Sequence, residues 1–480
     1  MKETTINFIF IMFIVISLLF TKEAETMEYQ NSLPLMSNGY GKDIRFYLFP
    51  DTKTEELLLL VNNLRKLNIN YVIFYDIMPE YGNPDLKEDI WIHPRNSYYR
   101  TRGLNKDIVL SKHKMKLLIQ LLHDNNIKAI YYDQICTKDK KFMIYTPIRY
   151  PKDYYNYSIP HFFSLDTLNK NKIISLYGKY YGYDANLYLI KDMYAEALAK
   201  TIDELDFDGV FLDSLTWLCE VSSFGRTYNG DSINKSSDDV CYEFISAVKK
   251  KVKKNIIVMG NNGVYKDPIR VYPKTRNIID FWIVEFPDLE LIKKIEIYPK
   301  RFYELHSVFS SGYYDVVIYQ PFFSISKPYI YKYLISIALI NGVGLYHKND
   351  YLGNSDLRKI IENYNIFVRS NESIFSKIAV NCISKVKNIC PKMIFNCKED
   401  NKNIAISLVL VDPNSYIWDP IKTYGNIYLF LDKHLCNKKI SITNPEQVDV
   451  MFTKQIENSY CKLKVEPPEN SSLILIKVRK

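Results

Sequence analysis

The sequence predicts an α/β fold, namely a (β/α)8 TIM barrel followed by a C-terminal antiparallel β-sandwich. Up to about residue 375, short apolar runs typical of strands alternate with amphipathic segments typical of helices. Beyond that point, short strand-like runs follow one another with only turns between them. We therefore expect a barrel over residues 43–375 and a sandwich over residues 376–480.

The N-terminus predicts a targeting segment. Residues 6–20 are almost wholly apolar and follow a single Lys2. This is the length of a signal-peptide core, and it is short for a membrane span, which needs about 20 residues. We interpret residues 1–24 as a signal peptide or an N-terminal membrane anchor and residues 25–42 as a linker. The protein is therefore expected to be secreted or held at the cell surface.

Eight apolar runs predict the strands of the barrel. Amphipathic segments such as "TEELLLLVNNLRKL" and "SKHKMKLLIQLLHDNN" separate the runs and predict the intervening helices. The loops after the second and third strands are long, and they lie at the strand ends that carry active-site loops in a barrel of this type. The predicted strands cover 43–49, 71–77, 128–133, 208–213, 255–260, 278–285, 315–320 and 342–347.

The C-terminal part predicts a separate domain made of strands alone. The runs "NIAISLVLVD", "NIYLFLD", "KKISITN" and "SSLILIKV" are short, and no amphipathic segment lies between them. Five of the 8 cysteines of the chain also lie after residue 380. Because five is odd, one of them is unpaired within this domain or bridges to Cys136, Cys219 or Cys241.

Charge and motifs exclude several classes of partner. The 63 Lys and Arg residues are interspersed with 54 Asp and Glu residues, so no basic block predicts binding to nucleic acid. No CxxC pair or His/Cys cluster predicts a metal site. Neither a P-loop nor a dinucleotide-binding fingerprint is present, so we expect no cofactor. The oligomeric state is left open.

Polar side chains recur where the predicted strands end. Asp213 ends the run "DGVFLD", and Glu285 ends "DFWIVE". Because all strands of such a barrel end at one face, we expect these side chains to surround a common mouth. Candidates for substrate binding at the same mouth are Tyr75, Asp76, Asp133, Asn261, Asn262 and Gln320.

Two carboxylates across a barrel mouth suit the hydrolysis of a glycosidic bond. One carboxylate attacks the anomeric carbon or activates a water, and the other protonates the leaving oxygen. A retaining enzyme needs the carboxylates about 5–5.5 Å apart, whereas an inverting enzyme needs about 6.5–9.5 Å. The residues alone do not choose between these two spacings for Asp213 and Glu285.

Several stretches, in the same order, resemble glycoside hydrolase family 66, the dextranases and cycloisomaltooligosaccharide glucanotransferases. They are "INYVIFYDIMPEYGNP", "FSLDTLNKNKIISLY", "FDGVFLDS", "MGNNGVY", "DFWIVEFPD", "LRKIIENYNIFVRSNESIF" and "LVDPNSYIWDP". The resemblance implies that Asp213 is the nucleophile and Glu285 the acid/base of a retaining enzyme. It also implies an α-glucan substrate, with dextran-like α-1,6 linkages favoured.

The chain departs from this family at identifiable places. The predicted barrel starts near Asp43, without the N-terminal β-domain of the family. Ile77 stands where the family has a tryptophan, and the histidine that is expected soon afterwards is absent from "MPEYGNP". These departures leave the exact sugar open, though not the carboxylate chemistry. Two other functions are also considered: another TIM-barrel glycosidase, such as an α-galactosaminidase-like enzyme, and a non-catalytic surface protein that binds carbohydrate.

Overall fold

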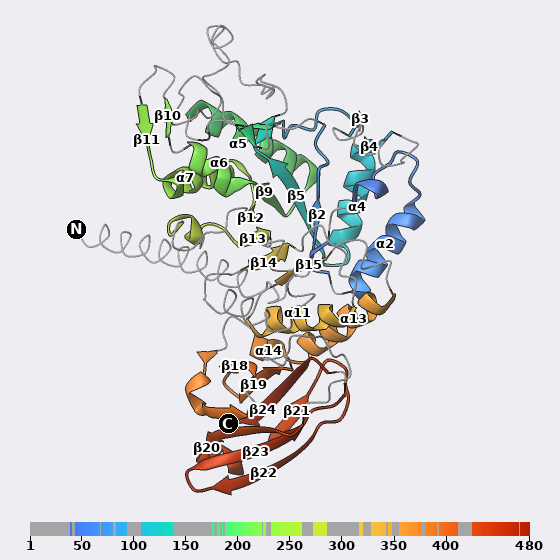
Figure 1. The fold of residues 1–480 in the computed structure, drawn as a ribbon. Coiled ribbons are helices and arrows are strands. Elements are labelled where there is room, and N and C mark those ends of the chain that lie inside the picture. Colours follow the sequence, from blue (N-terminus) through green and yellow to red (C-terminus); the bar gives the residue numbers. More distant parts are fainter. Residues whose placement is uncertain are drawn as a thin grey trace, which may run out of the picture.

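We describe the fold from a computed structural model, which contains a closed parallel barrel followed by a C-terminal domain of two antiparallel sheets (Figure 1). The structure describes residues 39–40, 44–67, 69–79, 83–93, 107–137, 175–176, 180–182, 185, 188–222, 224–226, 232–261, 272–285, 316–319, 328–341, 344–347, 355–375, 380–390, 393–410, 425–469 and 471–480. The predicted signal peptide or anchor lies outside these residues. Among the residues described, no helix is both long enough and apolar enough to span a bilayer.

The barrel strands are all parallel, and β1 closes the sheet by pairing with both β15 and β2. In chain order the strands are β1 (Gly39–Tyr40), β2 (Tyr71–Phe74), β5 (Lys128–Gln134), β9 (Gly209–Asp213), β12 (Ile257–Asn261), β13 (Phe281–Glu285), β14 (Val316–Tyr319) and β15 (Gly344–His347).

Amphipathic helices cover the outside of the barrel where the chain is described. In α2 (Thr54–Lys66), the buried residues Leu57, Leu60, Val61 and Leu64 recur at the spacing of one helix face. The other helices are α4 (Lys112–His123), α5 (Tyr188–Leu205), α6 (Leu215–Ser222), α7 (Ser237–Lys251), α11 (Pro328–Ile340), α13 (Ser355–Arg369) and α14 (Glu372–Phe375).

The complete (β/α)8 alternation stays a prediction. Between β12 and β13 the described residues contain only the 3-10 helix η4 (Thr275–Asn277). Residues 286–315, between β13 and β14, lie outside the described part. Short strands between the barrel strands form two hairpins and one three-stranded sheet. One hairpin and the three-stranded sheet lie in the predicted long loops, and the other hairpin lies between α6 and α7. These strands are β3 (Ile90–Ile92), β4 (Val109–Ser111), β6 (Cys136–Thr137), β7 (Ser175–Leu176), β8 (Tyr180–Gly182), β10 (Phe224–Arg226) and β11 (Ser232–Asn234).

The first predicted strand is wrong. Residues Ile44–Tyr47 form the 3-10 helix η1, and the first barrel strand, β1, lies inside the segment predicted to be a linker. Ile44 and Leu48 are both fully buried and stand four residues apart, which is the spacing of a helical turn rather than of a strand. Between them, the side chain of Arg45 is also buried. The barrel therefore begins before Asp43.

The C-terminal domain consists of two antiparallel sheets that share one apolar core. One sheet has the order β16 (Val380–Asn381), β18 (Ile394–Glu399), β19 (Asn403–Val409), β24 (Leu473–Arg479) and β21 (Ile440–Thr443). The other has the order β17 (Val386–Cys390), β20 (Ile427–Asp432), β23 (Tyr460–Glu466) and β22 (Met451–Glu457). Ile406 and Ile476 from the first sheet pack with Leu429 and Leu463 from the second. The 3-10 helices η6 (Ile383–Lys385) and η7 (Lys433–Asn437) complete the domain.

Three disulfides are present among the described residues. Cys382–Cys397 and Cys436–Cys461 lie within the C-terminal domain, and Cys219–Cys241 joins α6 to α7 in the barrel. The two bridges in the C-terminal domain account for four of its five cysteines. The remaining cysteine of this domain is Cys390, whose side chain lies outside the description.

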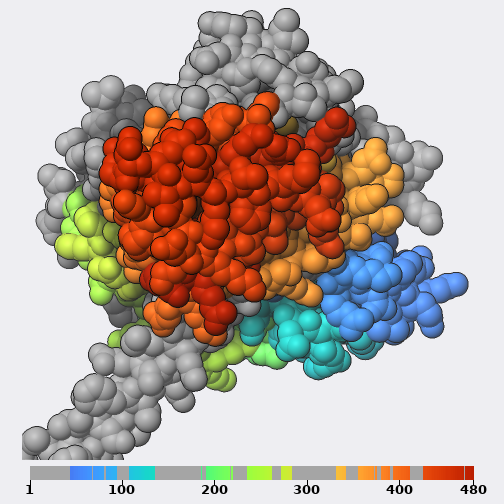
Figure 2. All heavy atoms as spheres, turned by 90° about the horizontal axis from the view of Figure 1, so that it is seen from below, coloured from blue at the N-terminus to red at the C-terminus, as the bar shows by residue number. Residues whose placement is uncertain are grey.

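The sandwich packs beside α11 and α13, which lie between it and the barrel strands (Figure 1, Figure 2). Ala405, Val409, Leu473 and Leu475 on its first sheet join the apolar cluster of the barrel helices. At the edge of this contact, the side-chain amide of Asn396 donates a hydrogen bond to a backbone oxygen of α11 over 2.6 Å. The two domains are therefore joined by both apolar packing and polar contacts.

Candidate active site

The side chains of the barrel strands alternate between the barrel interior and the surrounding helices, as the pleat of a strand requires. The inward-facing residues form one cluster, whereas neighbours such as Phe74, Tyr131, Val210 and Val258 belong to the cluster that contains the helices. The interior cluster contains Tyr71, Ile73, Tyr75, Met78, Ile130, Tyr132, Phe211, Ile257, Met259, Phe281 and Ile283. This alternation decides which strand-end side chains can reach the mouth.

Asp213 lies on the inward side of β9, two residues after Phe211. Its Oδ2 accepts a hydrogen bond from the hydroxyl of Tyr132 over 2.5 Å. Its Oδ1 accepts from the side-chain amide of Asn261 over 2.5 Å and from the backbone N–H of Ser214 over 2.8 Å. Three donors from three parts of the chain therefore fix this half-buried carboxylate, and both oxygens act as acceptors.

The backbone turns sharply just after Asp213. Ser214 has a φ of 56°, a left-handed conformation that costs free energy for a residue with a side chain. Helix α6 begins at the next residue, Leu215. A Cβ on Gly260 would lie 2.9 Å from Cδ2 of Leu215, so the missing side chain lets α6 pack close to β12. The strained turn and the close packing together place the start of α6 beside the carboxylate.

Aromatic rings form the wall next to Asp213. The ring of Tyr75 packs against that of Tyr132, with centroids 4.0 Å apart, and the ring of Phe211 contacts Tyr132 with its centroid 5.5 Å away. Tyr75 therefore reaches the Asp213 site through Tyr132. Of the predicted substrate contacts, the structure brings Asn261 to Asp213 directly and Tyr75 through this stack.

Asp133 lies on the opposite side of β5 from Tyr132. Its Oδ1 accepts a hydrogen bond over 3.0 Å from the hydroxyl of Tyr194 on α5, and its side chain is 1% exposed. Its Oδ2 has no hydrogen-bond partner among the described residues. Burial, with a smaller effect from the charge of Asp213, raises the pKa of Asp133 to about 7. This carboxyl group therefore lies behind the wall of the mouth, close enough for the charge of Asp213 to affect its pKa.

Asp76 is also turned away from the barrel interior. It is fully buried, its φ is 55°, and its Oδ2 lies 3.9 Å from Nη1 of Arg45 on η1. The backbone oxygen of the next residue, Ile77, accepts a hydrogen bond from the indole of Trp91 over 2.9 Å. These described contacts therefore serve the fold, because they hold the end of β2 against η1 and the β3–β4 hairpin.

The remaining predicted site residues are described in part or not at all. Glu285 is the last residue of β13 and pairs with Tyr319 of β14 in the barrel register, and its side chain lies outside the description. Asn262 and Gln320 fall outside the described residues. No group of three metal-ligating side chains occurs in the part of the chain that is described.

Three residues at or near the site were not predicted to be functional. Tyr132 bonds Asp213, Tyr194 bonds Asp133, and Arg45 lies beside Asp76. Tyr132 precedes Asp133 directly in "KAIYYDQ", and strict alternation allows only one of the two to face inward. Nothing in the local sequence of Arg45 or Tyr194 indicates either contact.

The chain is similar to known proteins in both sequence and fold. The sequence profile of glycosyl hydrolase family 66 matches residues 39–285, a range that contains both Asp213 and Glu285. No curated protein sequence matches the chain.

Solved structures with a similar fold include a cycloisomaltooligosaccharide glucanotransferase from Paenibacillus sp. complexed with cycloisomaltoheptaose. Its TM-score is 0.65 at 11% identity, and the alignment covers 93% of this chain and 85% of that one. An α-amylase from Geobacillus thermoleovorans, complexed with acarbose, has a TM-score of 0.56 at 10% identity, and the alignment covers 92% of this chain and 98% of that one. A maltogenic α-amylase from Thermotoga neapolitana has a TM-score of 0.55 at 13% identity, and the alignment covers 93% of this chain and 99% of that one. At such identities the likeness concerns the fold alone.

Proposed function

The chain belongs to glycosyl hydrolase family 66, and we propose that it is a retaining glycoside hydrolase that acts on α-glucans, with dextran-like α-1,6 linkages favoured. The hydrogen-bonded carboxylate of Asp213 carries this proposal. It lies inside the matched range, on the inward side of a barrel strand, and it is held by Tyr132 and Asn261. A nucleophile needs such fixed geometry at the strand ends of a barrel.

Asp213 acts as the nucleophile in this proposal. One of its oxygens forms a bond to the anomeric carbon as the glycosidic C–O bond breaks, which gives a covalent glycosyl-enzyme. The bonds from Tyr132, Asn261 and the Ser214 N–H hold the carboxylate in place before the attack. Little reorganisation is then needed during the reaction.

Glu285 acts as the acid and later as the base. It donates a proton to the leaving oxygen in the first step, and it takes a proton from the attacking water or sugar hydroxyl in the second. Glu285 follows Ile283 by two residues, and Ile283 faces the barrel interior. Alternation along β13 therefore predicts that Glu285 faces the same mouth as Asp213. Retention requires the two carboxyl groups to be about 5–5.5 Å apart.

The other predicted site residues take different roles. Tyr75, Asn261, Asn262 and Gln320 are expected to contact sugar hydroxyls. Asp133 is fully enclosed, so we infer that it supports the wall behind Asp213 instead. Because its pKa is raised to about 7, it stays largely uncharged at lower pH, and the wall behind Asp213 then carries no negative charge from Asp133.

Export from the cell fits the same proposal. An enzyme that degrades a polymeric glucan meets its substrate outside the cytoplasm, and residues 1–24 are proposed to direct it there as a signal peptide or anchor. The three disulfides support this location, because such bonds persist mainly in oxidising compartments.

One assay on the purified protein separates the three candidate functions. Release of reducing ends is measured on dextran, on amylose and on an α-N-acetylgalactosaminide. The proposal expects dextran to be cleaved fastest. Cleavage of the galactosaminide alone would favour the α-galactosaminidase-like enzyme, and glucan binding without cleavage would favour the non-catalytic protein.

Two variants test the site in the same assay. Asp213→Asn and Glu285→Gln are each expected to lower the rate at least a thousandfold. Asp449→Asn is the matched control, because Asp449 is an exposed carboxylate on the C-terminal domain, and it should retain the rate of the unchanged protein. Equal activity of Asp213→Asn and the control would refute the assignment.

A further inference from the structure

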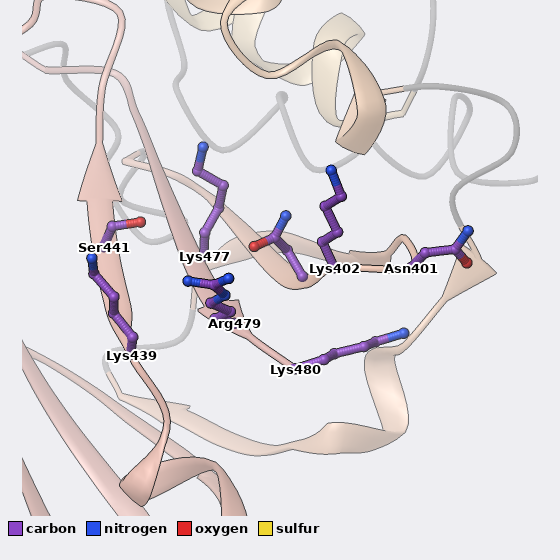
Figure 3. Close-up of a pocket in the computed structure, with 8 residues that line it drawn as sticks. Asn401, Lys402, Lys439, Ser441, Lys477, Arg479 and Lys480 are labelled. Atoms are coloured by element: carbon purple, nitrogen blue, oxygen red, sulfur yellow. The ribbon is translucent and has the colours of Figure 1, made fainter.

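A basic pocket lies on the C-terminal domain, at its first sheet (Figure 3). Its volume is about 540 Å³, which is within the range of small-molecule sites. Five cationic side chains line it, and none of the described residues that line it is apolar or acidic. The five are Lys402, Lys439, Lys477, Arg479 and Lys480.

The pocket occupies the polar end of a sheet face whose other end is apolar. Asn403 pairs with Arg479, and Ser441 pairs with Lys477, so these residues face the same side of the sheet. Farther along the same side, Leu475 packs against the barrel helices. The cations are therefore on the outer face, beside the barrel and away from the core of the sandwich.

Backbone hydrogen bonds fix the strand ends that carry the cations. The N–H of Arg479 donates to the backbone oxygen of Lys439 over 2.9 Å, and the N–H of Lys480 donates to that of Lys402, also over 2.9 Å. The carboxylate of Asp400 accepts from the backbone N–H of Lys402 over 2.7 Å. The β18–β19 turn and the end of β24 are thus held together, which limits the ordering that a ligand would require.

Most of the positive charge in the pocket is not neutralised. Among the residues that the structure describes, Lys480 has an ion pair, with Glu399 at 3.1 Å. The ammonium of Lys477 donates to the neutral amide oxygen of Asn371 over 2.8 Å. The side chains of Lys402, Lys439 and Arg479 have no carboxylate within ion-pair distance in the described part of the chain. Four of the five cations therefore lack an acidic partner there.

We propose that this pocket binds a saccharide that carries a phosphate ester. Clustered Lys and Arg side chains recognise a phosphate through charge-assisted hydrogen bonds. Asn401, Asn403 and Ser441 interleave with the cations, and their amide and hydroxyl groups can both donate to and accept from sugar hydroxyls. The volume exceeds what a phosphate group alone would fill, so a ligand with attached hydroxyls fits better than the free ion.

The same features argue against an anionic membrane as the ligand. Proteins that lie on a membrane usually add apolar side chains that enter the lipid, and the described residues that line this pocket include none. The proposal is also independent of the proposed hydrolysis, because no residue of the pocket belongs to the barrel mouth.

Calorimetric titration of the purified protein tests the ligand class. The probes are glucose 6-phosphate, inorganic phosphate and glucose. We expect one molecule of glucose 6-phosphate to bind per chain, inorganic phosphate to bind more weakly and glucose not to bind. The affinity for glucose 6-phosphate should fall as the salt concentration rises. Equal affinity for inorganic phosphate and glucose 6-phosphate would show that the pocket does not recognise the sugar. If neither of these two compounds bound, the proposed site would be refuted.

Single substitutions locate the binding. Arg479→Gln and Lys402→Gln should each weaken the binding of glucose 6-phosphate about tenfold, because each removes one charged contact. Lys433→Gln is the control, since Lys433 is an exposed lysine on η7, which packs with the other sheet. Thermal melting checks that all three variants are folded. An equal loss of affinity in all three variants would show that the ligand is attracted by the overall charge of the protein, and it would refute binding at this pocket.

Two further measurements distinguish this pocket from a membrane-binding surface and from the barrel mouth. Vesicles of phosphatidylserine and phosphatidylcholine should not sediment the protein; sedimentation without binding of glucose 6-phosphate would point to a membrane surface instead. Asp213→Asn should bind glucose 6-phosphate as the unchanged protein does. Loss of binding in that variant would place the phosphate at the barrel mouth and overturn the separate site.

Discussion

The hydroxyl of Tyr132 lies 2.5 Å from Oδ2 of Asp213, so the side chain of one barrel strand holds the carboxylate of the next. β5 and β9 pair directly, with Gln134 level with Asp213. The orientation of the proposed nucleophile therefore depends on β5 as much as on its own strand.

Removal of this hydroxyl tests its contribution. Tyr132→Phe should lower kcat/KM about ten- to a hundredfold, since a hydrogen bond to a charged group contributes about 1.5–3 kcal/mol. The melting temperature should change little. The adjacent Tyr131→Phe is the control, because Tyr131 faces the helices and its hydroxyl makes only a 3.4 Å contact with the backbone oxygen of Pro84. Similar losses in both variants would mean that the effect is structural.

The assigned roles of the two carboxylates predict different responses to azide. Asp213→Ala should be inactive on every substrate, because the chain then lacks the group that forms the covalent intermediate. Glu285→Ala should be slow on glucans and faster on a substrate with an activated leaving group. Azide should accelerate it further by replacing water in the second step, giving a glycosyl azide of retained configuration, which NMR identifies. Rescue of the Asp213 variant by azide would mean that the two residues have the opposite roles. A glycosyl azide of inverted configuration from the Glu285 variant would contradict its role as acid and base.

Burial of Asp133 predicts an unusual dependence of stability on pH. Its pKa is about 7 in the folded protein, against 3.8 for an aspartate that is fully exposed to water. Between these values the folded chain keeps a proton that the unfolded chain loses, so the free energy of unfolding falls as the pH rises. The whole contribution is on the order of 4 kcal/mol, at about 1.4 kcal/mol per pKa unit.

Asp133→Asn removes this dependence. The variant should match the unchanged protein near pH 4 and exceed it in stability at pH 8, as measured by urea unfolding at both values. The opposite order at pH 8 would show that Asp133 is charged and stabilising in the folded state.

Asp208, at the other end of β9 from Asp213, should affect stability rather than catalysis. Burial alone would raise its pKa, but hydrogen bonds from His123, Lys128 and the Ala129 N–H outweigh burial and lower it. Its contribution to stability is thus present at neutral pH and is lost as the pH falls through its lowered pKa. Asp208→Asn should lower the melting temperature at pH 7 while KM for dextran stays unchanged. A raised KM for dextran with an unchanged melting temperature would show that Asp208 affects catalysis rather than stability.

The strand ends were predictable from the sequence, whereas the direction of their side chains was not. The ends of β9, β12 and β13 fall within one residue of prediction, because each apolar run stops at a polar residue. In β5, however, both faces are buried, so "KAIYYD" carries no alternation of polar and apolar residues. Whether Tyr132 or Asp133 faces inward then depends on the register with the neighbouring strands.

The other differences between prediction and structure also concern contacts between distant parts of the chain. The run 43–49 is apolar enough for a strand, but η1 is selected by the burial of Ile44 and Leu48 and by the position of Arg45 beside Asp76. The pairing of the cysteines likewise depends on which strands and helices become neighbours, and their spacing left several pairings open.

The Cys219–Cys241 bridge has a practical consequence for anyone who prepares this protein. Helix α6 starts one residue after the strained Ser214, and Cys219 anchors it covalently to α7. A recombinant chain made in a reducing cytosol would keep this helix in place by packing alone, next to a turn that already costs free energy. Expression hosts that oxidise thiols during maturation are therefore the appropriate source of material, and added reductant in purification buffers should shorten the working lifetime of the preparation.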